Sequence, residues 1–162
     1  MHDWVVGGAV VESPAGVLLV RNRRPSGFDW TPPGGVIDAG EPLIEGLTRE
    51  VVEETGLVVT EWEGPLWHID VEAPGLGWHL RVEVHRAVVF EGELCLEDPD
   101  GIVVDARFVA PADALAHLEG GHPWVVQPLL EWLDSPWPAG RRFAYEVHGD
   151  DLATVEVRRR AG

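Results

Sequence analysis

The sequence contains no lysine, and this absence excludes several kinds of chemistry. All twelve of its basic residues are arginine. Lysine nucleophiles, Schiff bases and the lysine-containing phosphate loops of the Walker type are therefore excluded. The chain also has a single cysteine, Cys95, so neither an internal disulfide nor a cysteine-rich zinc site can form.

Positive charge as a whole is scarce. The 12 arginines are set against 28 aspartates and glutamates, which gives a formal net charge of -16. A surface of this sign repels nucleic-acid backbones and anionic membranes, so we expect neither a nucleic-acid polymer nor a membrane as partner. A small phosphorylated substrate remains acceptable if divalent cations screen the site.

Long apolar runs are missing as well. No stretch approaches the roughly eighteen consecutive apolar residues of a membrane span, and residues 1–4 lack a basic region followed by an apolar run. Together with the single cysteine, this predicts a soluble cytoplasmic protein. At 162 residues and 45% hydrophobic composition, the chain is long enough for one domain with a real core.

Acidic residues, which are present in excess, concentrate in residues 35–57. Residues 42–55 have the features of a helix: a proline at the start, acidic residues early, and Gly56 just past the end. An apolar and an acidic stripe would lie on opposite faces of this helix, because residues three and four apart share a face. The apolar stripe is Leu43, Leu47 and Val51, and the acidic stripe is Glu50, Glu53 and Glu54.

Carboxylates at this spacing repel one another. A solvated acidic face, in which Arg49 supplies the only cation, is one interpretation. The glycine-rich lead-in at residues 32–35 favours another, because it bends the backbone tightly and leaves carbonyl oxygens free to face the carboxylates. Hard oxygen ligands of this kind suit Mg²⁺ or Mn²⁺, so the pattern predicts a divalent metal site.

The same stretch resembles the Nudix box, whose pattern is G-x5-E-x7-R-E-U-x-E-E-x-G-U, with U a bulky aliphatic residue. Every defined position of the pattern is filled, by Gly35, Glu41, Arg49, Glu50, Val51, Glu53, Glu54, Gly56 and Leu57. The resemblance implies an α/β fold, an α/β/α sandwich with a mixed central sheet. It also implies cleavage of pyrophosphate linkages in nucleoside diphosphates that are joined to a further group.

Roles for the acidic residues follow from the resemblance. Glu53 and Glu54 would be the main metal ligands, and Glu50 a ligand or the general base. The carbonyl oxygen of Gly35 or Gly34 would complete the coordination of Mg²⁺, with Mn²⁺ as an alternative. Two or three ions would neutralise the diphosphate and activate the attacking water.

Other parts of the site are implied in the same way. Arg49 would orient the catalytic glutamate through a charge-assisted hydrogen bond, and Glu41 would be a structural cap. In this family a further carboxylate often comes from a loop after the box. Loop 91–100 offers four candidates, and we choose Glu97 as the metal ligand, against the alternative of a plain solvated loop. The four are Glu93, Glu97, Asp98 and Asp100.

The remaining chain reads as strands and helices of one domain, residues 1–140, with a C-terminal β-hairpin, residues 141–162, as an extension of it. The hairpin either covers its own core, which we favour, or pairs with a second copy in a homodimer. Strands are predicted at residues 4–12, 17–24, 78–90 and 102–109, and at residues 57–72, where a break at 64–65 divides the segment into two parts. A loop is predicted at residues 25–28, and helices at 111–118 and 123–134. Pro128 implies a kink or a late start of the last helix.

Candidates for substrate binding lie outside the box. Arg23 and Arg24 could hold a phosphate, against a merely solvated role. Trp30 would be core or lid, and the segment around Trp124 and Gln127 would help to select the base. The seven histidines show no metal-ligand spacing, so His79 and His85 are interpreted as ordinary sheet residues.

The leading hypothesis is a metal-dependent hydrolase acting on the pyrophosphate linkage of a small nucleotide. A nucleoside triphosphate and a nucleotide sugar of the ADP-ribose type are rival substrates. The alternative is a catalytically silent, nucleotide-sensing module of the same fold. The complete set of glutamates argues against that alternative.

Overall fold

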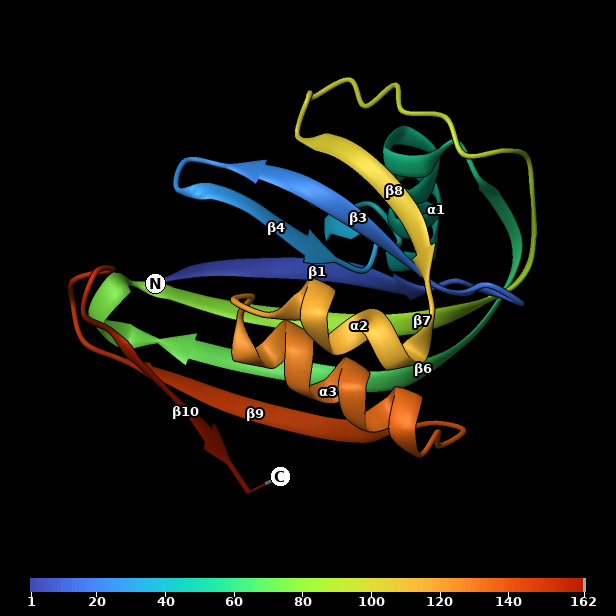
Figure 1. Ribbon diagram of the computed structural model, residues 1–162. Coiled ribbons are helices and arrows are strands. Elements are labelled where there is room, and N and C mark those ends of the chain that lie inside the picture. Colours follow the sequence, from blue (N-terminus) through green and yellow to red (C-terminus); the bar gives the residue numbers. More distant parts are fainter. Residues whose placement is uncertain (162) are drawn as a thin grey trace.

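The computed structural model describes residues 1–161, and its centre is a six-stranded sheet with the order β10-β9-β6-β7-β1-β5 (Figure 1). β1 runs parallel to β7 and β9 parallel to β6, whereas the other neighbours are antiparallel. The predicted mixed sheet is therefore confirmed. Its strands are β1 (His2–Val10), β5 (Gly34–Val36), β6 (Val58–Ala73), β7 (Trp78–Glu91), β9 (Arg141–His148) and β10 (Glu156–Arg160).

A second, four-stranded sheet is built around β3, which pairs with β2, β4 and β8. The loop predicted at residues 25–28 is shorter than expected, because β4 already begins at Gly27 and pairs with β3. Side-chain bonds from Asn22 on β3 to Asp29 and Thr31 on β4 tie the two strands together. The strands of this sheet are β2 (Glu12–Ser13), β3 (Gly16–Arg24), β4 (Gly27–Thr31) and β8 (Val103–Val109).

Helices cover both faces of the central sheet. Alternate residues of β1 show this, since side chains along a strand point to opposite faces. Ala9 packs in a buried cluster with Leu47 of α1, whereas Val10 packs in a separate cluster with Leu129 of α3. This is the predicted α/β/α layering, with α2 and α3 together in front of the sheet in Figure 1. The helices are α1 (Leu43–Thr55), the 3-10 turn η1 (Pro74–Leu76), α2 (Pro111–Leu118) and α3 (Pro123–Asp134).

β6 is one strand of 16 residues, so the prediction of two strand segments broken at residues 64–65 is wrong. The pairing with β7 shifts its register between Glu63 and Trp67. A bulge of this kind leaves unpaired the stretch that contains Pro65, which has no N–H to donate. The strand therefore continues through a sequence that looks like a break.

The last helix, α3, begins at Pro123 and carries Pro128 in its interior. Pro123 is well tolerated in the first turn, because the N–H that a proline lacks has no partner there. The helix already begins before Pro128, so the late start offered for it is wrong.

Among the described residues, no helix is both long and apolar enough to cross a membrane.

The C-terminal hairpin extends the central sheet. β9 pairs with β6, and three of its side chains, Phe143, Tyr145 and Val147, are buried in the cluster that contains Trp67 and Trp137. Within residues 1–161, β10 pairs only with β9 and forms the edge of the sheet. The hairpin thus covers core residues of its own domain. Gly162, the last residue of the predicted extension, lies outside the described residues.

Candidate active site

α1 carries the acidic stripe, and its ends are set by local sequence. Pro42 stands just before its first turn, and Gly56 ends it in a left-handed conformation, φ 81°, with its N–H donating to the Val52 carbonyl at 2.9 Å. Leu47 and Val51 are fully buried against the sheet. The acidic stripe therefore faces away from that core.

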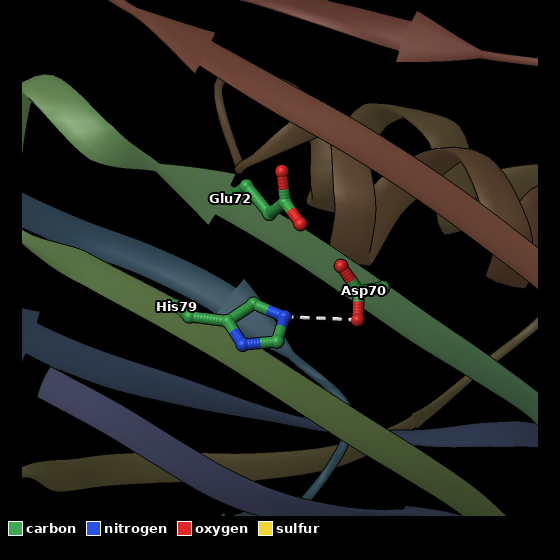
Figure 2. Close-up of side chains that lie close together, drawn as sticks. All are labelled: Asp70, Glu72 and His79. Carbon is green, nitrogen blue, oxygen red and sulfur yellow. Dashed lines mark hydrogen bonds and ion pairs between the residues drawn. The ribbon is translucent and has the colours of Figure 1, made fainter. Parts of the chain in front are cut away.

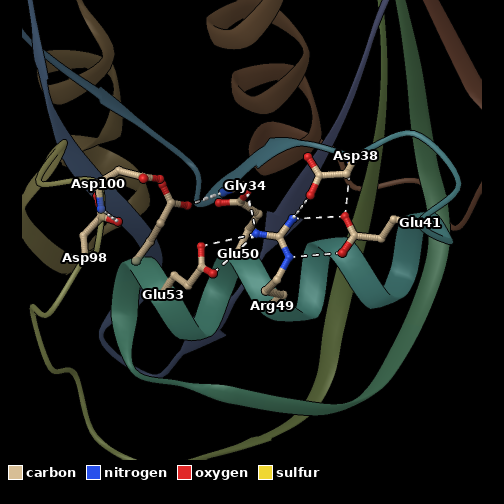
Figure 3. A network of polar contacts seen from close by, with 9 residues as sticks. Gly34, Asp38, Glu41, Arg49, Glu50, Glu53, Asp98 and Asp100 are labelled. Carbon is tan, nitrogen blue, oxygen red and sulfur yellow. Dashed lines mark hydrogen bonds and ion pairs between the residues drawn. The ribbon is translucent and has the colours of Figure 1, made fainter.

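Arg49 is the centre of the carboxylate network (Figure 3). Its Nε and Nη2 donate to the two oxygens of Glu41 at 3.1 and 3.0 Å, a bidentate pair. Its Nη1 donates to Glu50 at 3.2 Å and to Glu53 at 3.3 Å. One guanidinium thus fixes two of the three stripe carboxylates.

Glu41 serves as the anchor of Arg49. The hydrogen bond from Arg49 is the main reason that the pKa of Glu41 is held below its usual value. The other polar contact of Glu41 is the N–H of Asp38, which donates to its Oε1 at 3.2 Å. Both contacts hold the loop before α1 against the helix.

Gly35 leaves the space that the Glu50 carboxylate occupies. A Cβ at Gly35 would lie 2.7 Å from Cδ of Glu50, closer than any real contact allows. A glycine is thus required here for close approach of the side chain to the backbone. Burial raises the pKa of Glu50, against the opposing effect of Arg49.

Glu54 is the most enclosed carboxylate of the stripe, with 9% of its surface exposed. The backbone N–H of Gly34 donates to its Oε1 at 2.8 Å. Burial raises the pKa of Glu54 to about 8, with a further contribution from the Glu50 charge. An ionised carboxylate is costly in such a place unless a cation accompanies it. The clustered hard oxygen donors around Glu50 and Glu54 fit Mg²⁺ or Mn²⁺.

A cavity of about 430 Å³ opens beside these carboxylates. One end is lined by Gly34, Gly35, Glu50 and Glu54. The rest of the wall is mostly apolar and comes from both sheets and α3. It includes Val6, Ile69, Leu80, Val82, Val84, Trp124 and Val125. The cavity therefore joins an end lined by carboxyl groups to an apolar chamber.

The loop before β8 contributes carboxylates other than the predicted one. Glu97 is exposed and is not among the residues that line the cavity, whereas Asp98 and Asp100 line it. Asp98 accepts backbone N–H groups from Asp100, Ile102 and Val103 at 3.2, 3.0 and 3.0 Å, and so folds the loop. That fold presents Asp100 to the cavity and not Glu97.

Of the predicted substrate residues, Arg24 and Trp124 line the cavity, whereas Arg23, Trp30 and Gln127 do not. Arg23 is the neighbouring residue of β3, and strand alternation turns it to the other face. Trp30 packs edge-on against His117, with ring centroids 5.2 Å apart. Gln127 accepts a hydrogen bond from the Tyr145 hydroxyl at 3.0 Å, away from the cavity.

A second group of potential ligands lies on the sheet, outside this site (Figure 2). Ligand atoms of Asp70, Glu72 and His79 lie within 4.8 Å of one another. Both ring nitrogens of His79 already have carboxylate partners, Asp70 at 2.9 Å and Asp3 at 3.1 Å. His79 therefore bridges three strands, and the hydrogen bond to Asp70 raises its pKa. Sequence spacing could not show this, because the partners come from different strands.

The fold and the acidic helix beside the cavity define a class of protein that is known from other structures. A MutT Nudix hydrolase from Burkholderia pseudomallei matches with a TM-score of 0.65 and 26% identity, over 81% of this chain and 98% of that one. A MutT protein from Bacillus halodurans shares the fold, with a TM-score of 0.66 and 22% identity over 95% and 97% of the two chains. The family model of the NUDIX domain matches residues 1–133. The chain belongs to the Nudix family, and the predicted family, fold and enzyme class are confirmed.

The relatives that match this chain differ in the share of their own length that the match covers. The Mycobacterium tuberculosis protein named 8-oxo-dGTP diphosphatase 2 is 30% identical over 123 residues, 68% of this chain and 87% of that protein. The nucleoside diphosphate-linked moiety X motif 6 protein of Xenopus laevis is 42% identical over 57 residues, 35% of this chain and only 26% of that protein. An ADP-ribose pyrophosphatase of Methanocaldococcus jannaschii is 34% identical over 59 residues, 36% of this chain and 35% of that protein.

Proposed function

We infer that this protein hydrolyses the pyrophosphate linkage of a nucleoside triphosphate with the help of Mg²⁺ or Mn²⁺. The observation that carries the proposal is one cavity in which Glu50 and Glu54 meet an apolar chamber with an aromatic wall, Trp124. The carboxylates suit a metal-bound polyphosphate, and the chamber suits a base. Likeness over most of the length of the mycobacterial protein supports a triphosphate substrate.

Glu50, Glu53, Glu54 and the Gly35 carbonyl would hold the ions, with Asp100 as a further ligand in place of Glu97. Bound divalent ions would neutralise the diphosphate and lower the pKa of a water molecule. The protein's own residues would position the charges, and one of them would accept a proton.

Arg49 and Arg24 have separate positioning roles in this proposal. Arg49 holds Glu50 through its Oε1, and among the described residues no donor occupies Oε2 of Glu50. That oxygen is free to accept the proton of the attacking water. Arg24, which lines the cavity and is held at 3.2 Å by Asp29, would bind a phosphate oxygen of the substrate.

A nucleotide sugar of the ADP-ribose type is the second candidate substrate, because the methanogen protein shares the helix region. The chamber favours the triphosphate. It offers one enclosed apolar wall for one base, within the usual range of about 300–1,000 Å³ for small-molecule sites.

The test is product analysis for a panel of nucleoside triphosphates and ADP-ribose, with Mg²⁺, with Mn²⁺ and with a chelator. We expect metal-dependent release of a nucleoside monophosphate, and a fall of at least about a hundredfold in turnover for Glu54→Gln. Glu45→Gln is the matched control, since Glu45 is exposed on the same helix and does not line the cavity. Equal inertness of the wild type and Glu54→Gln on every nucleotide would support the silent sensing module instead.

The setting of the enzyme is part of the proposal. A net charge of -16 and one cysteine support action on free nucleotides in the cytoplasm and not on a nucleic-acid polymer. The outer side of β10, which no strand of residues 1–161 covers, supports pairing with a second copy in a homodimer. Light scattering of the purified protein tests the dimer.

A further inference from the structure

Asn22 is a buried polar residue in the wall of the cavity, with only 3% of its surface exposed. Its amide nitrogen donates to Asp29 Oδ1 at 3.0 Å and to Thr31 Oγ1 at 2.9 Å. A carboxylate can only accept, so the orientation of the amide is fixed by Asp29. Both N–H groups of Asn22 are thereby used within the fold.

The carbonyl oxygen of Asn22 has no such partner. Among residues 1–161, no side-chain or backbone group donates a hydrogen bond to its Oδ1. The oxygen is not fully buried in the core either. Within the same residues, the only fully buried side-chain polar atom without a hydrogen-bond partner is Nε1 of Trp67, so Oδ1 of Asn22 retains some exposed surface. The cavity is therefore the place to which this acceptor is open. Arg24, two residues further along β3, lines the same cavity, as strand alternation requires.

The apolar wall of the chamber supplies shape and stacking but little hydrogen bonding. The ring of Trp124 stacks on the ring of His122, with ring centroids 4.3 Å apart and an interplanar angle of 7°. A stacked base is bound through its π face, which every base has, so stacking alone selects poorly. Selection needs an atom that can only accept or only donate. Thr31 can do either, because a hydroxyl rotates, whereas the fixed carbonyl of Asn22 can only accept.

We propose that Asn22 Oδ1 reads the base by accepting a hydrogen bond from its exocyclic amino group. The protein would then prefer nucleotides with an amino-bearing adenine or cytosine over the oxo-bearing hypoxanthine or uracil. An oxo group at the same place sets two acceptors against each other and leaves both unpaired. This assignment rests on the proposed function, since it places the base in the chamber beside the carboxylates.

The experiment compares two matched pairs of nucleotides, ATP with ITP and CTP with UTP, by kcat/KM and by equilibrium binding followed through tryptophan fluorescence. We expect a preference of at least about tenfold for the amino member of a pair. The purine and pyrimidine pairs show which of the two base sizes the chamber accepts. In Asn22→Leu, and in Asn22→Ser should the first variant fold poorly, the preference should fall below about threefold.

A purely structural role of Asn22 would have a different signature. It would slow both members of a pair equally and leave their ratio unchanged. Thr31→Val is the control, because it removes one acceptor of the Asn22 amide while Asp29 still fixes the orientation of the Asn22 carbonyl. That variant should slow both nucleotides and retain the preference.

The outcomes separate this assignment from the proposed function. Hydrolysis without an amino preference, or a preference that survives in Asn22→Leu, overturns the role of Asn22 alone. Preferential binding without hydrolysis supports Asn22 and overturns the enzymatic proposal. Neither binding nor hydrolysis of any nucleotide overturns both.

Discussion

Glu54 has a higher pKa in the folded protein than in the unfolded chain, because it is buried. Burial raises the pKa of Glu54 from 4.5 to about 8. Between those pH values the folded protein holds a proton that the unfolded chain has released. Without metal, the stability contributed by this site is therefore greatest at low pH and falls as the pH rises through 8.

Replacing Glu54 with glutamine removes this pH dependence while keeping an acceptor for the Gly34 N–H. In a chelator, Glu54→Gln should gain stability relative to the wild type between pH 5 and pH 9, by up to a few kcal/mol. Urea unfolding of both proteins across this pH range measures the difference. Parallel stability curves would show that Glu54 is not protonated in the folded, metal-free protein.

Among single residues, the sequence predicted which side chains reach the cavity where a motif sets their spacing. It did not predict this where the facing of a strand or helix residue decides which side chains line the cavity. Spacing on one helix placed Glu50 and Glu54 together, and the structure brings both to the cavity. Arg23 and Gln127 lie in the expected segments but on faces that do not line the cavity. Asn22 had no motif to mark it, since its role depends on partners that only pairing of β3 with β4 provides.

At the scale of elements, His79 on β7 links its neighbours β1 and β6 through Asp3 and Asp70. The hydrogen bond to Asp70 is the main cause that raises the pKa of His79 above 6.5. A raised histidine pKa contributes stability that is fully present below pH 6.5 and is lost as the pH rises through the folded-state pKa.

The variant His79→Gln should therefore be less stable than the wild type at pH 6, and this deficit should shrink at pH 9. Thermal unfolding of both proteins at the two pH values, in a chelator, provides the measurement. A deficit that is the same at both pH values would mean that His79 contributes by packing and not by charge.

Elements were predictable from sequence where periodicity and end signals agree, as for α1. They were mispredicted where tertiary pairing overrides a local signal. β6 passes through Pro65 because a bulge takes up the unpaired residues, and β4 starts where a loop was expected because Asn22 ties it to β3. Neither effect is visible in a single strand read alone.

At the scale of the whole molecule, the net charge of -16 acts on an anionic substrate before it reaches the site. Repulsion between charges of one sign slows association and is screened over about 10 Å at 0.1 M salt. We therefore expect kcat/KM for a nucleoside triphosphate to rise with KCl concentration at constant free Mg²⁺. A fall with salt would show that local positive charge, such as Arg24, steers the substrate.

The central claim is that the acidic stripe of α1 binds a divalent cation, and calorimetric titration with Mn²⁺ tests it most directly. The account predicts binding by the wild type, a loss of at least about tenfold in affinity for Glu54→Gln, and no loss for His79→Gln, which alters the other acidic group. Unchanged Mn²⁺ affinity in Glu54→Gln, or loss of binding in His79→Gln, would contradict it.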